Sequence, residues 1–320
     1  MAMELATEEW KGSHVLSVSD FSVESVAELF AAADKCKAAV NGAEGSDPAV
    51  LQVCKNKVLG LVFYEPSTRT NCSFAAAMQR LGGTCLQVSE NSSVKKGETL
   101  QDTMRCIECY CDLTVLRHPE KGSVSRVSAY LRKPVLNAGD GDGEHPTQAL
   151  LDLFTIANEQ GGKIEGLTIT MLGDLKYGRT THSLAKLLAM YRVKLNFVSP
   201  QGLGMPESVK KSVAALGRAE VFECSDLQEV VAKSDVLYVT RVQKERFQDL
   251  AEYERVQGSF VVDSKALDNA MSTCTVMHPL PRVGEIAEEV DDYPNAAYFR
   301  QMENGMYVRM AIIAKVLGVL

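Results

Sequence analysis

Short apolar runs alternate with stretches of helical periodicity along most of this chain. The first strong run, Val58–Tyr64, is continuously apolar, as in a strand that is covered on both faces. After it, Phe74, Met78 and Leu81 fall on one side of a predicted helix, which ends at Gly82. The same periodicities predict further helices over 22–40 and 98–111, and strands over 84–88, 112–116 and 134–137.

A second alternation begins after a predicted helix over 147–159, where Gly161 and Gly162 mark a seam. Strands are predicted over 167–172, 193–198, 219–222, 235–240 and 260–262, and a final apolar helix over 303–320. Strands that alternate with helices form parallel sheets with helices on their faces. The sequence therefore predicts an α/β fold of two doubly wound domains, each a parallel sheet flanked by helices.

Composition limits the classes of protein and partner. The 320 residues are 46% hydrophobic and 23% charged, a balance typical of a globular protein with a substantial core. No apolar run approaches the roughly 20 residues that cross a bilayer, and residues 1–10 lack the apolar core of a signal peptide. A cytoplasmic protein is expected. The net charge of −7 and the absence of a basic tail disfavour nucleic acid and anionic membranes as partners.

Nine cysteines, an odd number, argue against a complete disulfide framework. Cys106, Cys109 and Cys111 are close enough in sequence to suggest a metal site. They lie in a helical pattern without a second pair at zinc spacing, which favours thiols packed in or beside the core. We therefore expect no metal site.

In parallel sheets, ligands bind beyond the carboxyl ends of the strands, so the residues that follow each strand are informative. Glu65–Thr70 follows the first strong strand and enters a helix, whose unpaired N–H groups favour an anion. Ser67, Thr68 and Thr70 add hydroxyls and Arg69 adds a planar cation suited to phosphate. A polar helix cap with one solvated arginine remains an equal alternative.

Two later loops in the first half carry candidate groups. The loop 92–97 contains two adjacent lysines, and taken alone it is more typical of a solvated surface loop than of a site. The loop 137–148 is rich in glycine, and Pro146 opens the next helix. His145 and Gln148 would then lie at a strand end, where they could donate to a carbonyl oxygen. A glycine-rich loop is an unusual place for a histidine buried purely in the core.

The second half repeats this arrangement. The loop 173–180 follows a predicted strand and resembles a dinucleotide loop, but it lacks the G-x-G-x-x-G pattern. Arg179 in it is better suited to a carboxylate. Arg241–Arg246 follows the strand over 235–240, and His278–Arg282 follows residues 275–277.

Taken together, these loops resemble those of the transcarbamoylase family, and within it the aspartate transcarbamoylases. Ser67–Thr70 is similar to the carbamoyl-phosphate signature of the family, and His145–Gln148 to a segment shared by its members. Specificity for aspartate is indicated by Arg179, by Arg241–Gln243 and by His278–Pro281, where ornithine enzymes typically have His-Cys-Leu-Pro. The similarity runs from about residue 14 to the C-terminus and is greatest to the eukaryotic form.

The resemblance implies a role for each matching residue. It predicts carbamoyl-phosphate binding by Ser67, Thr68, Arg69, Thr70, Arg117, His145, Gln148, Leu280 and Pro281. It predicts aspartate binding by Arg179, Arg241, Gln243 and Lys96. Among these, catalytic roles fall to Arg69, Thr70, Arg117, His145 and Lys96, with Arg117, His145 and Thr70 polarising the carbamoyl carbonyl.

The resemblance also implies an assembly and a domain plan. Family enzymes are homotrimers with shared active sites, to which Ser92 (or the adjacent Ser93) and Lys96 would come from the neighbouring subunit. Glu65 and Arg246 would take part in domain closure. Residues 1–148 with 301–320 would form the carbamoyl-phosphate-binding domain, and residues 149–300 the aspartate-binding domain.

No cofactor is expected, because the aspartate amine would attack carbamoyl phosphate directly. Fusion to, or association with, carbamoyl-phosphate synthetase and dihydroorotase is expected, since the eukaryotic form is often part of a fused pyrimidine-pathway polypeptide.

Three alternatives stay open at this point. A transcarbamoylase for another amine, such as ornithine, is disfavoured by Arg179 and Arg241. An NAD-linked dehydrogenase is disfavoured by the missing glycine pattern. A non-catalytic trimerisation module is disfavoured because every family site residue that can be matched is present.

Overall fold

The computed structural model describes residues 10–89, 97–243, 250–256, 258 and 260–320. Contacts divide the chain into unit 1, Met1–Leu151 with Glu303–Leu320, and unit 2, Asp152–Met302. Both junctions fall inside helices, namely α5 (Pro146–Glu159) and α10 (Tyr298–Val316). The predicted boundaries, after residues 148 and 300, lie in the same two helices.

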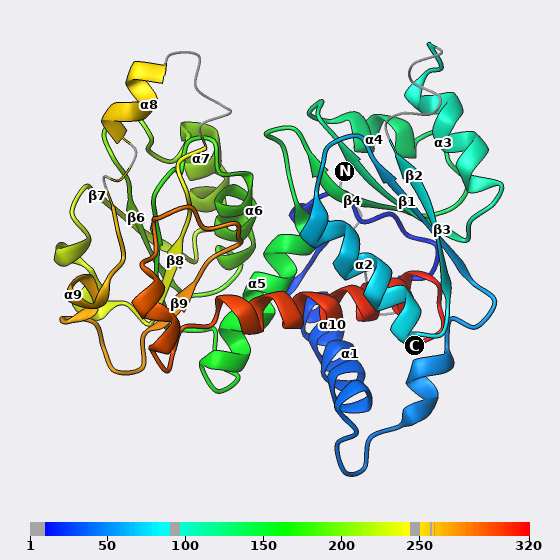
Figure 1. The fold of residues 1–320 in the computed structure, drawn as a ribbon, viewed down its shortest axis with the longest axis horizontal. Helices are drawn as coiled ribbons and strands as arrows, with labels where there is room; N and C mark the ends of the chain where they lie inside the picture. The colour runs from blue at the N-terminus through cyan, green and yellow to red at the C-terminus, as the bar shows by residue number, and fades with distance from the viewer. Residues whose placement is uncertain (1–9, 90–96, 244–249, 257, 259) are drawn as a thin grey trace. The chain divides into compact units, whose positions relative to one another are not determined.

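Unit 1 is built on a four-stranded parallel sheet in the order β2-β1-β3-β4, flanked by helices (Figure 1). Its strands are β1 (Val58–Phe63), β2 (Thr84–Ser89), β3 (Leu113–His118) and β4 (Val135–Asp140). Its helices are α1 (Val23–Asn41), α2 (Thr68–Arg80), α3 (Leu100–Glu108), α4 (Ser123–Ser128) and the first part of α5, with short 3-10 turns at Val18–Asp20 and Pro48–Gln52.

The ends of α1 follow local rules. Ser22 precedes the helix and its hydroxyl accepts a hydrogen bond from the N–H of Ser25, while Gly42 ends it with a left-handed φ of 62°. The helix predicted over 22–40 therefore corresponds to α1.

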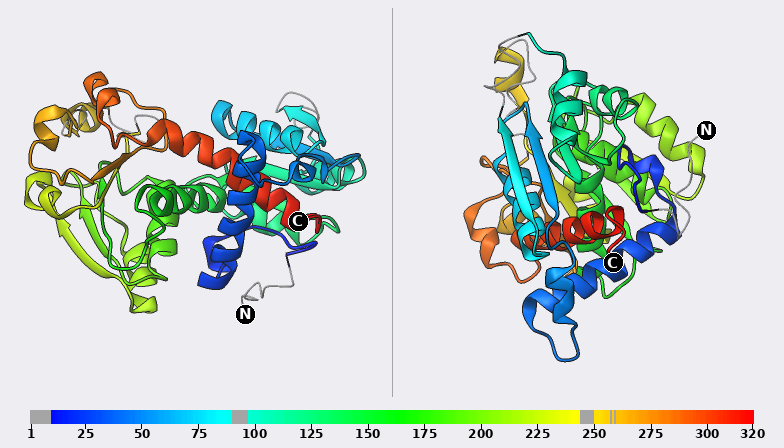
Figure 2. Two further views of the ribbon diagram at one scale, coloured as in Figure 1. Left: turned by 90° about the horizontal axis from the view of Figure 1, so that it is seen from below. Right: turned by 90° about the vertical axis from the view of Figure 1, so that its right-hand side faces the viewer.

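The last part of α10 belongs to unit 1. Figure 2 shows its red end beside the blue α1 in both views, and Lys315 lies 3.6 Å from Glu28 of α1. Val308, Met310 and Ile312 of α10 are fully buried. The C-terminal helix is therefore part of the apolar core of the unit that the N-terminal residues begin.

Unit 2 contains a five-stranded parallel sheet in the order β7-β6-β5-β8-β9. Its strands are β5 (Thr168–Leu172), β6 (Lys194–Val198), β7 (Glu220–Cys224), β8 (Val236–Val239) and β9 (Thr275–Met277). Its helices are α6 (Arg179–Leu188), α7 (Glu207–Leu216), α8 (Leu250–Val256) and α9 (Ser264–Leu267), with the start of α10 and 3-10 turns at Leu227–Glu229, Val231–Lys233 and Glu288–Asp292. The strand order reverses between β5 and β8, the place where doubly wound sheets bind ligands.

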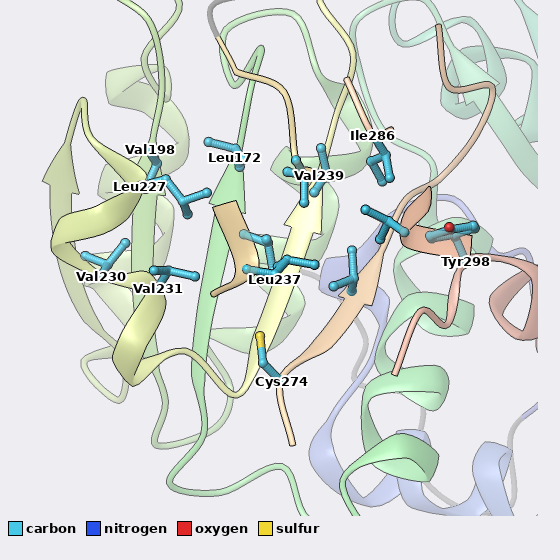
Figure 3. Packing of buried hydrophobic residues seen from close by; sticks show 14 residues of the cluster. Leu172, Val198, Leu227, Val230, Val231, Leu237, Val239, Cys274, Ile286 and Tyr298 are labelled. Carbon is cyan, nitrogen blue, oxygen red and sulfur yellow. The ribbon is translucent and has the colours of Figure 1, made fainter. Parts of the chain in front are cut away.

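One apolar layer of unit 2 lies on a single face of this sheet. Leu172 of β5 and Leu237 and Val239 of β8 converge there with Ile286 and the ring of Tyr298 (Figure 3). Residues 237 and 239 share a face because side chains alternate along a strand, so residue 238 between them lies on the opposite face.

The predicted fold class is confirmed, since both sheets are parallel and flanked by helices. The strand predicted over 260–262 is wrong. Val262 makes an isolated parallel bridge with Ile286 instead of joining the sheet, and the edge position beside β8 is taken by β9. Val262 alone of this short apolar run is fully buried, so the composition resembles that of a strand without the pairing.

The expectation for the cysteine cluster is only partly right. All nine cysteines are free, and Cys111 is buried, but Cys106 and Cys109 are exposed. The two exposed thiols lie on the solvent side of α3 and its C-cap, opposite the buried Met104.

Gly173 allows the ends of β5 and β8 to approach each other. Its φ is 117°, and a Cβ there would lie 2.1 Å from the carbonyl oxygen of Thr240. We expect Gly173→Ala to lower the free energy of unfolding by roughly 2–4 kcal/mol in urea denaturation, through backbone strain and overpacking. Gly284→Ala is the matched control, because φ is 107° but no atom lies within 4 Å of the added Cβ. Equal destabilisation of the two variants would contradict the steric argument.

Candidate active site

Three groups that the sequence singles out lie at one edge of the sheet in unit 1. Ser67–Thr70 follows β1, Arg117 is the penultimate residue of β3, and His145 follows β4. Phe63 is the register partner of Arg117 across the β1–β3 pair. Because parallel strands point their carboxyl ends the same way, these segments share an edge.

The start of α2 has the properties of an anion site. Ser67 precedes the helix without a side-chain bond to its first turn, and Thr68 and Arg69 are exposed, whereas Thr70 is buried. The N–H groups of the first helical turn point outward with a partial positive charge. A phosphate at this place would meet N–H groups, hydroxyls and the Arg69 guanidinium together.

Arg117 is held by two neighbours. Its Nη1 donates to the carbonyl oxygen of Ala138 at 3.2 Å, and its Nε lies 3.3 Å from the carboxylate of Glu65. The side chain is 13% exposed, so the cation is partly desolvated and its direction is fixed. A fixed, partly buried cation suits a developing negative charge better than a mobile one.

The loop after β4 is closed by Asp140. Its carboxylate accepts hydrogen bonds from the N–H of Gly122 at 2.7 Å and of Glu144 at 2.8 Å. A Cβ on Gly143 would lie 2.6 Å from Asp140 Oδ1, so only glycine fits. This tight turn delivers His145, which is 3% exposed, to the start of α5.

Gln148 lies one turn further along α5 and is 6% exposed. The glycine-rich loop and the helix start thus place His145, predicted to polarise the carbamoyl carbonyl, and Gln148, predicted to bind carbamoyl phosphate, on one buried helical turn. A buried histidine and amide are appropriate donors to a carbonyl oxygen.

Unit 2 presents its candidate residues at the point where the strand order reverses. Arg179 is the first residue of α6, after the loop that leaves β5, and Arg241 follows β8, the neighbour of β5. Arg241 also lines a cavity of about 270 Å³ with Gly173 and Glu285. Two guanidinium groups therefore come from adjacent strand ends of one unit.

The buried Asp174 connects these two strand ends. Burial raises the pKa of its carboxyl group, while the N–H groups of Tyr177 and Gln243 donate to the carboxylate and counteract this. Gln243 Nε2 also donates to the carbonyl oxygen of Tyr177 at 3.1 Å. Gln243, predicted to contact aspartate, here links the loop after β8 to the loop that precedes Arg179.

The segment after β9 is fixed by the His278 ring. The N–H of Leu280 donates to Nδ1 at 2.8 Å, so Nδ1 carries no proton, and Nε2 donates to the Glu285 carboxylate at 2.6 Å. Burial lowers the pKa of His278, and Glu285 opposes this only in part, which keeps the ring neutral. The ring thereby sets the backbone of Leu280 and Pro281, whose carbonyl groups are the predicted ligands.

Some predicted residues lie outside the described part of the chain. These are Ser92, Lys96 and Arg246. Sequence reasoning in turn missed Asp174 and Glu285. Asp174 was available as the buried acid after an apolar strand, but no periodicity signals that Glu285 contacts a histidine seven residues earlier.

The described residues contain neither a cluster of metal ligands nor a membrane-spanning helix. No group of three or more histidine, cysteine, aspartate or glutamate side chains could hold a metal ion there. No helix among those described is long and apolar enough to cross a membrane.

Comparisons with known proteins match two successive parts of the chain. The family profile "Aspartate/ornithine carbamoyltransferase, carbamoyl-P binding domain" matches residues 13–158, and the profile "Aspartate/ornithine carbamoyltransferase, Asp/Orn binding domain" matches residues 165–316. The multifunctional protein pyr1-3 of Dictyostelium discoideum is 50% identical over 99% of this chain. The chain spans 14% of the length of that relative.

Solved structures are similar over nearly the whole chain. Aspartate transcarbamoylase from Trypanosoma cruzi in complex with carbamoyl phosphate and aspartate has a TM-score of 0.90 and 40% identity, covering 98% of this chain and 99% of its own. The catalytic subunit of M. jannaschii aspartate transcarbamoylase has a TM-score of 0.87 and 44% identity, with 96% and 98% covered.

The neutral His278 ring makes stability depend on pH. Because its pKa is lowered in the folded state, its contribution is complete above about pH 6.5, the pKa of an unfolded histidine, and is lost as the pH falls through the lower folded-state pKa. We expect acidification from about pH 7 to about pH 5 to reduce the free energy of unfolding more in the wild type than in His278→Gln. Urea denaturation across this range measures the difference, and parallel profiles would contradict it.

Proposed function

Because this chain belongs to the aspartate/ornithine carbamoyltransferase family, we propose that it transfers the carbamoyl group of carbamoyl phosphate to L-aspartate. The products are N-carbamoyl-L-aspartate and phosphate, and the reaction is the committed step of de novo pyrimidine synthesis. The observation that carries the choice of aspartate is the pair Arg179 and Arg241 at adjacent strand ends. Two guanidinium groups suit an amino acid with two carboxylates, whereas ornithine carries a second amine.

Unit 1 supplies the phosphate half of the reaction. Ser67, Thr68 and the N–H groups at the start of α2 hold the phosphate, and Arg69 stabilises the charge that grows as it leaves. Thr70, Arg117 and His145 polarise the carbamoyl carbonyl, and Gln148 contacts the carbamoyl amide. The buried positions of Thr70, His145 and Gln148 favour strong hydrogen bonds there.

Unit 2 supplies the amino-acid half. Arg179 and Arg241, with Gln243, hold the carboxylates of aspartate. The carbonyl groups of Leu280 and Pro281 accept hydrogen bonds from the carbamoyl nitrogen and from the attacking amine. The uncharged aspartate amine attacks the carbamoyl carbon, the bond from that carbon to the phosphate oxygen breaks, and a proton of the amine passes to the phosphate. Direct attack needs no nucleophilic side chain, and holding both reactants in place supplies much of the rate.

We propose that the enzyme is a cytoplasmic homotrimer in which Ser92 and Lys96 complete the site of a neighbouring subunit. Lys96 would bind aspartate and take part in catalysis. Glu65, which contacts Arg117, and Arg246 would take part in domain closure. Relatives many times longer than this chain support a role as one module fused to, or acting beside, carbamoyl-phosphate synthetase and dihydroorotase.

The first experiment compares amines. With carbamoyl phosphate, the purified chain should release phosphate and form carbamoyl-aspartate with L-aspartate but not with L-ornithine. Arg179→Ala should raise the KM for aspartate by roughly 30-fold or more, because it removes a charged partner of a carboxylate. Arg218→Ala is the matched control, since this exposed arginine pairs with Glu165 on the surface.

Turnover with ornithine would overturn the assignment of the second substrate, and a folded trimer without turnover would favour a non-catalytic module.

If active sites are shared between subunits, two inactive variants should complement each other. Arg69→Ala and Lys96→Ala should each lose roughly 10²–10³-fold in kcat, because each removes a cation from the reacting charges. Mixed under conditions of subunit exchange, the two variants should recover part of the activity, since some sites would then combine the intact Arg69 of one variant with the intact Lys96 of the other. Each variant mixed with itself is the control, and no recovery despite confirmed exchange would argue against shared sites.

A further inference from the structure

Three fully buried polar side chains form a hydrogen-bonded network inside unit 2. The carboxylate of Asp152, in α5, accepts a hydrogen bond from the Tyr238 hydroxyl at 2.7 Å and another from Gln301 Nε2 at 2.6 Å. All three residues are 0% exposed. A buried carboxylate is costly unless such donors satisfy it, so the arrangement of the three side chains is tightly determined.

Both ends of this hydrogen-bonded network reach segments that are assigned to substrate binding. At one end, the phenol of Tyr238 is hydrogen-bonded to the hydroxyl of Thr180, the residue after Arg179. At the other, Oε1 of Gln301 accepts the N–H of His278 at 3.0 Å. His278 in turn accepts the N–H of Leu280 through Nδ1, so hydrogen bonds connect the start of α6 with the segment after β9.

The surroundings argue against a purely stabilising role. On the other face of β8, Leu237 and Val239 pack in a predominantly apolar layer (Figure 3). An apolar replacement of a buried polar network often costs little stability, so the sheet itself does not need one. What apolar contacts do not provide is a fixed direction for a backbone N–H or for the first turn of a helix.

We propose that Asp152, Tyr238 and Gln301 are positioning residues that hold the Arg179 guanidinium in place for aspartate. The inference rests on the proposed function and adds residues that touch neither substrate. A displacement of the Arg179 guanidinium would weaken the binding of aspartate and leave the phosphate-binding residues of unit 1 as they are.

Tyr238→Phe tests this, because it removes one hydroxyl and keeps the ring in the core. Its matched control is Tyr307→Phe in unit 1, where an equally buried tyrosine donates to the carboxylate of Glu303 at 2.7 Å. We expect Tyr238→Phe to raise the KM for aspartate roughly tenfold and to leave the KM for carbamoyl phosphate within about twofold of the wild type. Tyr307→Phe should change neither KM, although both variants should lose similar thermal stability.

Thr180→Val gives a second test that does not depend on a core substitution, because Thr180 is only partly buried. It breaks the network at its end and should raise the KM for aspartate in the same direction. If the wild type carbamoylates aspartate while Tyr238→Phe or Thr180→Val matches Tyr307→Phe in both KM values, the positioning role is wrong and the proposed function stands. If the wild type does not carbamoylate aspartate, the proposed function itself fails.

Discussion

Parallel hydrogen bonding between strands is the constraint on which the site depends. It brings the carboxyl ends of β1, β3 and β4 to one edge of the first sheet, and those of β5, β8 and β9 to one edge of the second. Residues distant in sequence, such as Arg179, Arg241 and His278, thereby come to the same edge of the second sheet. The sheet pairing determines which loops meet, and the loops determine only the final directions of their side chains.

Those final directions are set by buried polar groups. Asp140, Asp174 and the His278–Glu285 pair each bind backbone N–H groups of a loop that leaves a strand. Each is costly to bury, and each is satisfied only in one loop conformation. Because the cost of burying these groups is offset only in that conformation, the loops have a definite geometry, which catalysis by fixed charges requires.

Much of this could be predicted from the sequence, because the relevant information is local. Continuous apolar runs such as Val58–Phe63 mark buried strands, and the residues that directly follow them, including Ser67 and Arg179, are then at strand ends by chain order alone. The same local rule gave a wrong strand over 260–262, since composition does not reveal that Val262 pairs with Ile286 outside the sheet.

The supporting residues could not be predicted in this way. Asp152, Tyr238 and Gln301 lie on three different elements, and nothing in the spacing of positions 152, 238 and 301 indicates that their side chains meet. Glu285 approaches His278 through an irregular loop that has no period to read. Such contacts depend on packing in three dimensions, and one sequence contains no direct signal for them.

The division of the chain has a consequence for biosynthesis. Unit 2 is one continuous segment, whereas unit 1 is completed by residues 303–320, and the end of α10 is buried in it beside α1. During translation, every residue of unit 2 therefore emerges from the ribosome before the last piece of unit 1. While unit 2 is being synthesised, the N-terminal part of unit 1 therefore lacks the end of α10 and exposes the apolar surface that this helix later covers. A nascent chain at that stage is an expected client for chaperones.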